Sequence, residues 1–264
     1  MSNYYIPSNE QGVSESIGFM LIFTIVIAGI ALVTLYGYPL LLQQQLGAEE
    51  KIMEKNMIVL QNDMKSLAYK TVPFKETSLK IGGGSLTVYN SSYDTVNSPT
   101  FAITYPGCPT SPCLSFKSGE LRYESVRAQT DISLQDGAVV MRPRIQSGST
   151  MLADPRWFYD VNPITDERTM VINLINITSD SIMAKEGIGT VRMTLGETNY
   201  TYLNTPNSDL IIDYFPDPAH DYSVAWRNYF TQKLGMSNPT ANRYQLANVD
   251  TLVIKQYKVN IEAI

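Results

Sequence analysis

The stretch from Ile17 to Leu42 constrains the fold more than any other part of the chain, because its 26 positions contain no charged residue. As an α-helix rising about 1.5 Å per residue it would be roughly 39 Å long, more than the ~30 Å hydrocarbon core of a bilayer. A buried helix of a globular core seldom runs this far without a charge. A cleaved secretory signal usually has a shorter apolar run, preceded by basic residues and followed by a small-residue cleavage site. We therefore expect a retained membrane helix at residues 17–42, behind a short leader at residues 1–16.

The next segment, residues 43–72, continues the helical pattern but is polar on most of its surface. Apolar residues recur on one face at spacings of three, four and seven, which is typical of an amphipathic helix. This face, called here the methionine stripe, consists of Leu46, Met53, Met57, Leu60, Met64 and Leu67. The stripe has two interpretations: it packs against the chain's own β-domain, or against helices of neighbouring subunits. Pro39, within Gly37-Tyr38-Pro39, should kink or interrupt the apolar helix on its outer side.

Residues 73–264 have the composition of a β-rich domain, with frequent Tyr, Thr, Val and Ile punctuated by Gly and Pro. We expect an α+β protein, in which the long helix is followed by a mainly antiparallel β-sandwich-like domain containing one short helix at residues 221–234. Gly82-Gly83-Gly84 lies between two strand-like runs and predicts a hairpin turn. The final run at residues 251–261 alternates imperfectly but is also read as a strand.

The two cysteines lie close together, as Cys108 and Cys113. Their spacing fits neither a four-ligand zinc site nor a Cys-x-x-Cys redox pair. A local disulfide is the favoured interpretation and two free thiols the alternative. A disulfide implies an oxidising setting outside the cytoplasm.

Three N-x-[ST] sequons begin at Asn90, Asn176 and Asn199, and they predict glycosylation of an extracellular domain. The leader contains no Lys or Arg, so the positive-inside rule gives no orientation. From the short leader and the chemistry of the β-domain we expect the N-terminus inside the cell and the β-domain outside.

Motifs for catalysis are missing from the sequence, and we expect neither an enzyme, a cofactor nor a metal site. The single histidine, His220, is interpreted as a solvent-facing turn or capping residue rather than a catalytic base. Lys and Arg are scattered in a chain of net charge −5, which argues against nucleic-acid binding.

The segment from Gln11 to Phe19, followed by the apolar helix, resembles the start of archaeal type IV pilin-like proteins. The resemblance implies that a prepilin-type peptidase cuts between Gly12 and Val13, and that the helix then packs in a filament core. Gln11 stands where that family usually has a charged residue, and Glu15 would be third in the mature chain.

Three further segments, residues 73–86, 124–140 and 225–230, look similar to a largely uncharacterised archaeal membrane-anchored family. Together these resemblances imply a pilin-like anchor with an external β-domain and supply no catalytic motif. The expected function is a non-catalytic surface protein in or beside a type IV pilus-like filament, in contact with membrane lipid and other pilin-like subunits. The alternative is a solitary membrane-anchored envelope protein or adhesin that binds a glycan or another surface protein.

Overall fold

A computed structural model of the chain describes residues 10–70, 72–92, 98–126 and 128–264. The chain divides into two compact units, Met1–Ala48 and Glu49–Ile264, which are described separately. The helical elements are α1 (Glu10–Leu32), the π-helical turn η1 (Val33–Gly37), α2 (Tyr38–Lys70), α3 (Ser223–Asn228) and the π-helical turn η2 (Tyr229–Lys233).

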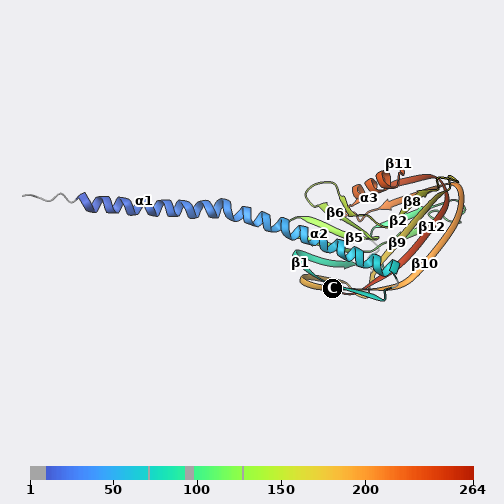
Figure 1. The fold of residues 1–264 in the computed structure, drawn as a ribbon, viewed down its shortest axis with the longest axis horizontal. Helices are drawn as coiled ribbons and strands as arrows, with labels where there is room; N and C mark the ends of the chain where they lie inside the picture. The colour runs from blue at the N-terminus through green and yellow to red at the C-terminus, as the bar shows by residue number, and fades with distance from the viewer. Residues whose placement is uncertain (1–9, 71, 93–97, 127) are drawn as a thin grey trace, which may run out of the picture. The chain divides into compact units, whose positions relative to one another are not determined.

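Twelve strands of the described residues form one sheet, and all their pairings are antiparallel except that between β9 and β12. The strands are β1 (Phe74–Tyr89), β2 (Thr100–Thr104), β3 (Leu114–Lys117), β4 (Glu120–Ser125), β5 (Thr130–Gln135), β6 (Ala138–Pro143), β7 (Thr150–Ala153), β8 (Phe158–Val161), β9 (Arg168–Ser179), β10 (Met183–Phe215), β11 (Ser237–Thr240) and β12 (Arg243–Ala263). The main path runs β7-β6-β5-β4-β1-β10-β12-β9-β8, with β2, β3 and β11 attached beside it. The α+β prediction is confirmed, although the sandwich-like domain is a single curved sheet (Figure 1).

The N-terminal unit contains a helix long and apolar enough to cross a membrane, so it is a candidate single-pass anchor. From Ser16 to Leu41 each side chain is exposed in the structure, and only Gly37 is partly covered. Two hydroxyls within this segment are satisfied by the helix itself: Thr24 Oγ1 donates to Met20 O at 2.7 Å and Thr34 Oγ1 to Ile30 O at 2.8 Å. A polar group that is bonded inside the helix can enter lipid without leaving a lone donor there.

The predicted interruption of the helix takes the form of the π-turn η1 directly before Pro39. Pro39 has no N–H to donate to the preceding turn, so one α-helical hydrogen bond is missing there. The N–H of Tyr38 bonds instead to Val33 O, five residues back, which lets the helix continue without a break.

The second unit has two hydrophobic clusters, each built around a helix. The α2 core joins the buried part of the methionine stripe to strand residues such as Leu86, Tyr123, Ile177, Val191 and Val259. The α3 core joins Trp226 and Phe230 to strand residues such as Phe101, Trp157, Ile172, Leu210 and Leu252. In Figure 1 the second half of α2 and the short α3 lie along different parts of the curved sheet.

The long strands take part in both cores by using opposite faces. In β12, Leu252 and Ile254 belong to the α3 core, whereas Tyr257, Val259 and Ile261 belong to the α2 core. The parallel pairing with β9 runs without a shift from residue 251 to 261, so even and odd positions point to opposite sides throughout. The apolar residues of this segment alternate imperfectly because the first part of the strand is covered on one face and the second part on the other.

Three features of the sheet differ from the sequence prediction. Gly82-Gly83-Gly84 is not a hairpin turn, because β1 continues through it as one strand with a register shift between Ile81 and Leu86. Gly83 has φ +65°, and a Cβ on Gly84 would lie 2.2 Å from the Glu124 carbonyl oxygen, so both positions favour glycine. The runs at residues 189–195, 199–203 and 209–215, which the sequence pattern presents as separate strands, form the single strand β10. The short strands β7, β8 and β11 were not predicted.

Candidate functional site

The methionine stripe is buried against the chain's own sheet, as the first of its two interpretations predicted. Met53, Met57, Leu60, Met64 and Leu67 have no exposed surface. Leu46, the remaining member, lies in the N-terminal unit and is only partly covered. The stripe is therefore five residues long in the folded domain, and it is not available to neighbouring subunits.

Polar side chains on either side of the stripe bind the backbone of the sheet domain. Gln61 Nε2 donates to the carbonyl oxygens of Gly137 at 2.7 Å and Asp154 at 3.0 Å. Lys65 Nζ also donates to Asp154 O, at 2.9 Å. These contacts fix both the rotation and the axial position of α2, which apolar packing alone would define less sharply.

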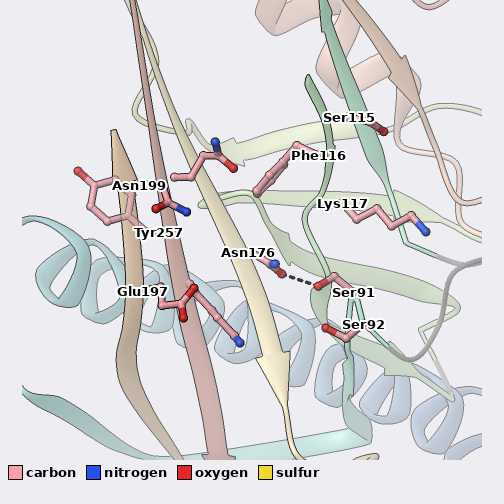
Figure 2. A pocket seen from close by; sticks show the side chains of 11 residues that line it. Ser91, Ser92, Ser115, Phe116, Lys117, Asn176, Glu197, Asn199 and Tyr257 are labelled. Carbon is pink, nitrogen blue, oxygen red and sulfur yellow. Dashed lines mark hydrogen bonds between the residues drawn. The ribbon is translucent and has the colours of Figure 1, made fainter. Parts of the chain in front are cut away.

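A polar pocket of about 400 Å³ lies where the α3-core face of the sheet continues beyond its last apolar residues. Leu252 and Ile254 are followed on that face by Gln256 and Lys258, and Asn176 pairs with Lys258 across the β9–β12 ladder. The pocket is lined by Ser91, Ser92, Ser115, Phe116, Lys117, Asn176, Glu197, Asn199, Gln256, Tyr257 and Lys258. Figure 2 shows Ser91 joined to Asn176, where the hydroxyl donates to the amide oxygen at 2.5 Å. The lining therefore consists mainly of amide, hydroxyl and charged groups of both signs.

The three predicted glycosylation sites differ in accessibility. Asn90 is 6 % exposed, and both polar atoms of its side-chain amide are hydrogen-bonded. Nδ2 donates to Ser179 O, and Oδ1 accepts from the Ser92 N–H. Asn176 is half-buried on β9. Asn199 is exposed on β10. The burial of Asn90 argues against its modification in the folded protein, whatever the sequence pattern suggests.

The predicted disulfide between Cys108 and Cys113 is present, with its Cα atoms 5.7 Å apart. It closes the loop between β2 and β3. The backbone N–H of Cys113 bonds to Ile103 O at 3.0 Å, which ties the closed loop to the end of β2.

Sequence reasoning missed a buried charge network centred on Arg122 of β4. The guanidinium is 1 % exposed and forms ion pairs with Glu120 and with Asp217, the latter at 2.9 Å. It also lies 4.3 Å from the centroid of the Tyr89 ring. Asp217 comes from the segment before α3, so this network joins β4 to the loop that carries α3.

His220 belongs to the same network; it closes a turn with Asp217, as predicted, but its ring is half-buried rather than solvent-facing. Its ring is half-buried, with Nδ1 at 2.6 Å from Arg122 Nη1 and at 2.9 Å from Asp217 Oδ2. Nδ1 can accept from the guanidinium in a ring that carries its proton on Nε2, or donate to the Asp217 carboxylate in the other tautomer, but it cannot do both; Nε2 lies 3.7 Å from Glu124 Oε1. The single strand-like bridge between Asp217 and His220 holds the ring inward.

The charges in this network displace two pKa values. Burial, together with the positive charge of Arg122, lowers the pKa of His220 below its ordinary value. Burial alone would raise the pKa of Asp217, but hydrogen bonds from Arg122 and the Ala219 N–H outweigh it and lower that pKa. His220 is therefore mostly neutral and Asp217 ionised at pH 7.

No sequence pattern indicates this network, because its members lie about one hundred residues apart. In the sequence, Glu120 and Arg122 alternate with Leu121 and Tyr123 in a short strand. Charged residues in such a strand normally face solvent, whereas here all four side chains are buried. Among the described residues, acidic, histidine and cysteine side chains form no cluster suited to a metal ion. The network has the arrangement of a structural clamp between β4 and the α3 segment.

The predicted processing positions Gly12 and Val13 lie in the first turns of α1. Their side chains lie outside the described part of the structure. The backbone there is helical up to Glu10, so the peptide bond between them belongs to regular helix in this structure.

A family model described as a family of unknown function, DUF7289, matches residues 11–262. The match includes the apolar helix, α2 and the sheet domain down to the end of β12. No curated protein and no solved structure matches the chain.

Proposed function

We propose that this chain, which belongs to the DUF7289 family of unknown function, is a non-catalytic, pilin-like cell-surface protein. Its N-terminal helix anchors it in the membrane, and it acts in or beside a type IV pilus-like filament as a minor subunit or assembly component. The resemblance of residues 11–19 to the start of archaeal pilin-like proteins motivates the filament.

The proposal is based mainly on the contrast in exposure between the first and second parts of the long helix. Residues 17–42 carry no charge and are exposed on every side apart from the partly covered Gly37 and Leu42, whereas one face of residues 53–67 is buried against the sheet. An apolar helix surface of this size is stable only in lipid or against other apolar helices. Since the methionine stripe is covered by the chain's own sheet, it does not provide contacts with other subunits, and α1 offers an exposed apolar surface for them.

The chemistry of the sheet domain supports the orientation that we propose. The disulfide between Cys108 and Cys113 supports an oxidising compartment for residues 73–264. In this arrangement the short leader lies inside the cell and the sheet domain outside. Protease added to intact cells should then digest the sheet domain, whereas its protection would refute this orientation.

N-terminal sequencing of protein purified from its native membrane tests the filament proposal. We expect a start at Val13, loss of that start in a Gly12→Asp variant, and an unchanged start in a Gly18→Ala control. Gly18 has open space around its Cα, so the added methyl group should not disturb the helix. An intact Met1 in the mature protein, with no pilin-like protein copurifying, would contradict the proposal.

Disulfide cross-linking of an Ile25→Cys variant, with the new cysteine within α1, distinguishes a filament subunit from a solitary anchor. The two native cysteines are paired, so the new thiol would be the reactive one among the described residues. Cross-linked dimers in intact membranes support helix packing between subunits, and monomers alone favour a solitary anchor.

The alternative function is a membrane-anchored envelope protein or adhesin, and the polar pocket of Figure 2 is the observation that favours it. A screen of saccharides against the detergent-solubilised chain tests this alternative. Binding that is lost on Gln256→Ala, which removes one of the lining amides, would support it.

A further inference from the structure

Asn199 is the one sequon asparagine in the described structure whose side chain is exposed. Its amide forms no hydrogen bond with any other described residue. Its strand, β10, pairs with β1 as far as Thr194 and with β2 from Ile211 onward, while β12 occupies its other edge. In the described parts of the chain, residues 195–210 of β10 therefore present one edge without a strand partner.

Asn176 is the contrasting case. Both edges of β9 are occupied at this point, by β12 on one side and by two loops on the other, since Ile177 N donates to Ser118 O at 2.7 Å and Ser91 N approaches Ile177 O at 3.5 Å. The Asn176 amide oxygen accepts from Ser91, and Thr178 of the same sequon is 5 % exposed, with its hydroxyl donating to Val259 O at 3.4 Å. An enzyme must reach both the amide and the hydroxyl of a sequon, and this pair is enclosed.

We propose that Asn199 carries an N-linked glycan, and that the glycan lies over the polar pocket and the unpaired edge of β10. In the transfer, Asn199 Nδ2 loses a proton and bonds to the anomeric carbon of a saccharide carried on a lipid phosphate. The bond from that carbon to the phosphate oxygen breaks, and the lipid phosphate leaves. The inference depends on the proposed exposure of the sheet domain outside the cell.

The surroundings of Asn199 are suited to the first sugars of such a chain. Asn199 pairs with Gln256 across the β10–β12 ladder, so both side chains lie on the pocket face. Glu197 and Lys258 line the same pocket and offer an acceptor and donors to sugar hydroxyls. An exposed strand edge is also a template for pairing with another chain, and a bulky polar group at residue 199 would block that pairing.

The test is mass spectrometry of the full-length protein purified from its native host. Trypsin separates the three sequons, because Asn90 falls in residues 81–117, Asn176 in 169–185 and Asn199 in 193–227. We expect an added saccharide mass on the third peptide alone. The mass should disappear completely in Asn199→Gln and Thr201→Ala, and persist in Thr201→Ser and Asn176→Gln.

Unmodified residues 193–227 in wild-type protein would overturn the inference, as would modification confined to Asn90 or Asn176. Protease accessibility on intact cells, measured in the same preparation, separates this failure from that of the proposed function. If protease reaches the sheet domain but Asn199 carries no saccharide, only the glycan proposal is refuted. A protected sheet domain refutes the extracellular orientation on which both proposals depend.

Discussion

The side-chain amide of Gln61, in the middle of α2, donates a 2.7 Å hydrogen bond to the carbonyl oxygen of Gly137, in the turn between β5 and β6. The turn is buried, and these two residues are 76 positions apart in the sequence. The amphipathic helix is therefore attached to the sheet through a specific polar contact as well as through apolar packing.

Replacing Gln61 by Leu should destabilise the sheet domain by about 1–3 kcal/mol, because the buried Gly137 carbonyl oxygen loses its side-chain donor and the Asp154 carbonyl oxygen keeps only Lys65. Thermal unfolding of the full chain in detergent, followed by near-UV circular dichroism, measures the change. The matched control is Asn62→Ala, one position along the helix on its exposed face. Equal effects of the two substitutions would show that the Gln61 contact contributes nothing specific.

Replacing Met57 by Ala should cost about 2–5 kcal/mol, because the side chain is fully buried and its removal leaves a cavity. Met57→Leu nearly conserves volume and should cost less than about 1.5 kcal/mol. The same unfolding measurement distinguishes them. A negligible effect of the alanine variant would argue that the stripe does not pack against the sheet in solution.

Replacing Arg122 by Met should destabilise the fold by about 3–5 kcal/mol, because Glu120 and Asp217 would stay buried without their cation. Arg192→Met is the control, since its ion pair with Glu262 is half-exposed and worth at most about 1 kcal/mol. Chemical denaturation of both variants gives the comparison, and similar losses would contradict a clamp role for Arg122.

His220 should make the fold less stable in mild acid. Its pKa is lowered in the folded protein, so the unfolded chain binds a proton more readily and stability falls as the pH drops below 6.5. The free energy of unfolding, measured between pH 5 and pH 8, should change less steeply in His220→Gln. The chain has one histidine, so its imidazole resonance in an NMR titration reports the folded-state pKa directly.

Asp136 should act in the opposite direction at higher pH. Burial raises the pKa of its carboxyl well above the ordinary value, and Oδ2 has no partner among the described residues, while Oδ1 accepts from Ile175 N at 2.8 Å. A raised pKa contributes stability at low pH that is lost as the pH rises through the folded-state value. Asp136→Asn keeps the Oδ1 acceptor and tolerates the positive φ of 48°, so it should be more stable than wild type at pH 8.

The control for Asp136 is Asp166→Asn, which has a similar φ of 56° but an exposed side chain. It should leave the pH dependence of stability unchanged. An equal gain in both variants would mean that the effect comes from the backbone conformation rather than from the buried carboxyl.

Sequence patterns predicted the local features of this fold. The charge-free helix, the stripe at Met53 to Leu67 and the Cys108–Cys113 pair are short-range signals, and each has a direct physical cause. The imperfect alternation in β12 was visible as well, but its explanation required two cores on opposite faces of one sheet, which no local window contains.

Long-range relationships could not be predicted in the same way. Glycine at residues 82–84 is compatible with a hairpin or with a bulge, and only the arrival of β4 at Gly84 and of β10 at both ends decides between them. The partners of Arg122 lie on β4 and before α3, and their charges suggested solvent exposure. The burial of Asn90 likewise depends on Ser179, 89 residues away.

The position of β12 between β9 and β10 has a consequence for how the chain matures. β9 and β10 are consecutive in the sequence, yet both lack their shared neighbour β12 until residues 243–263 have been synthesised; before then β9 can pair only with β8, and β10 only with β1 and β2. During translation, the edges of β9 and β10 that later bind β12 therefore stay unpaired. The nascent polypeptide should therefore need a holding chaperone until its last twenty or so residues emerge, and ribosome-stalled intermediates that end before residue 243 should be highly sensitive to protease.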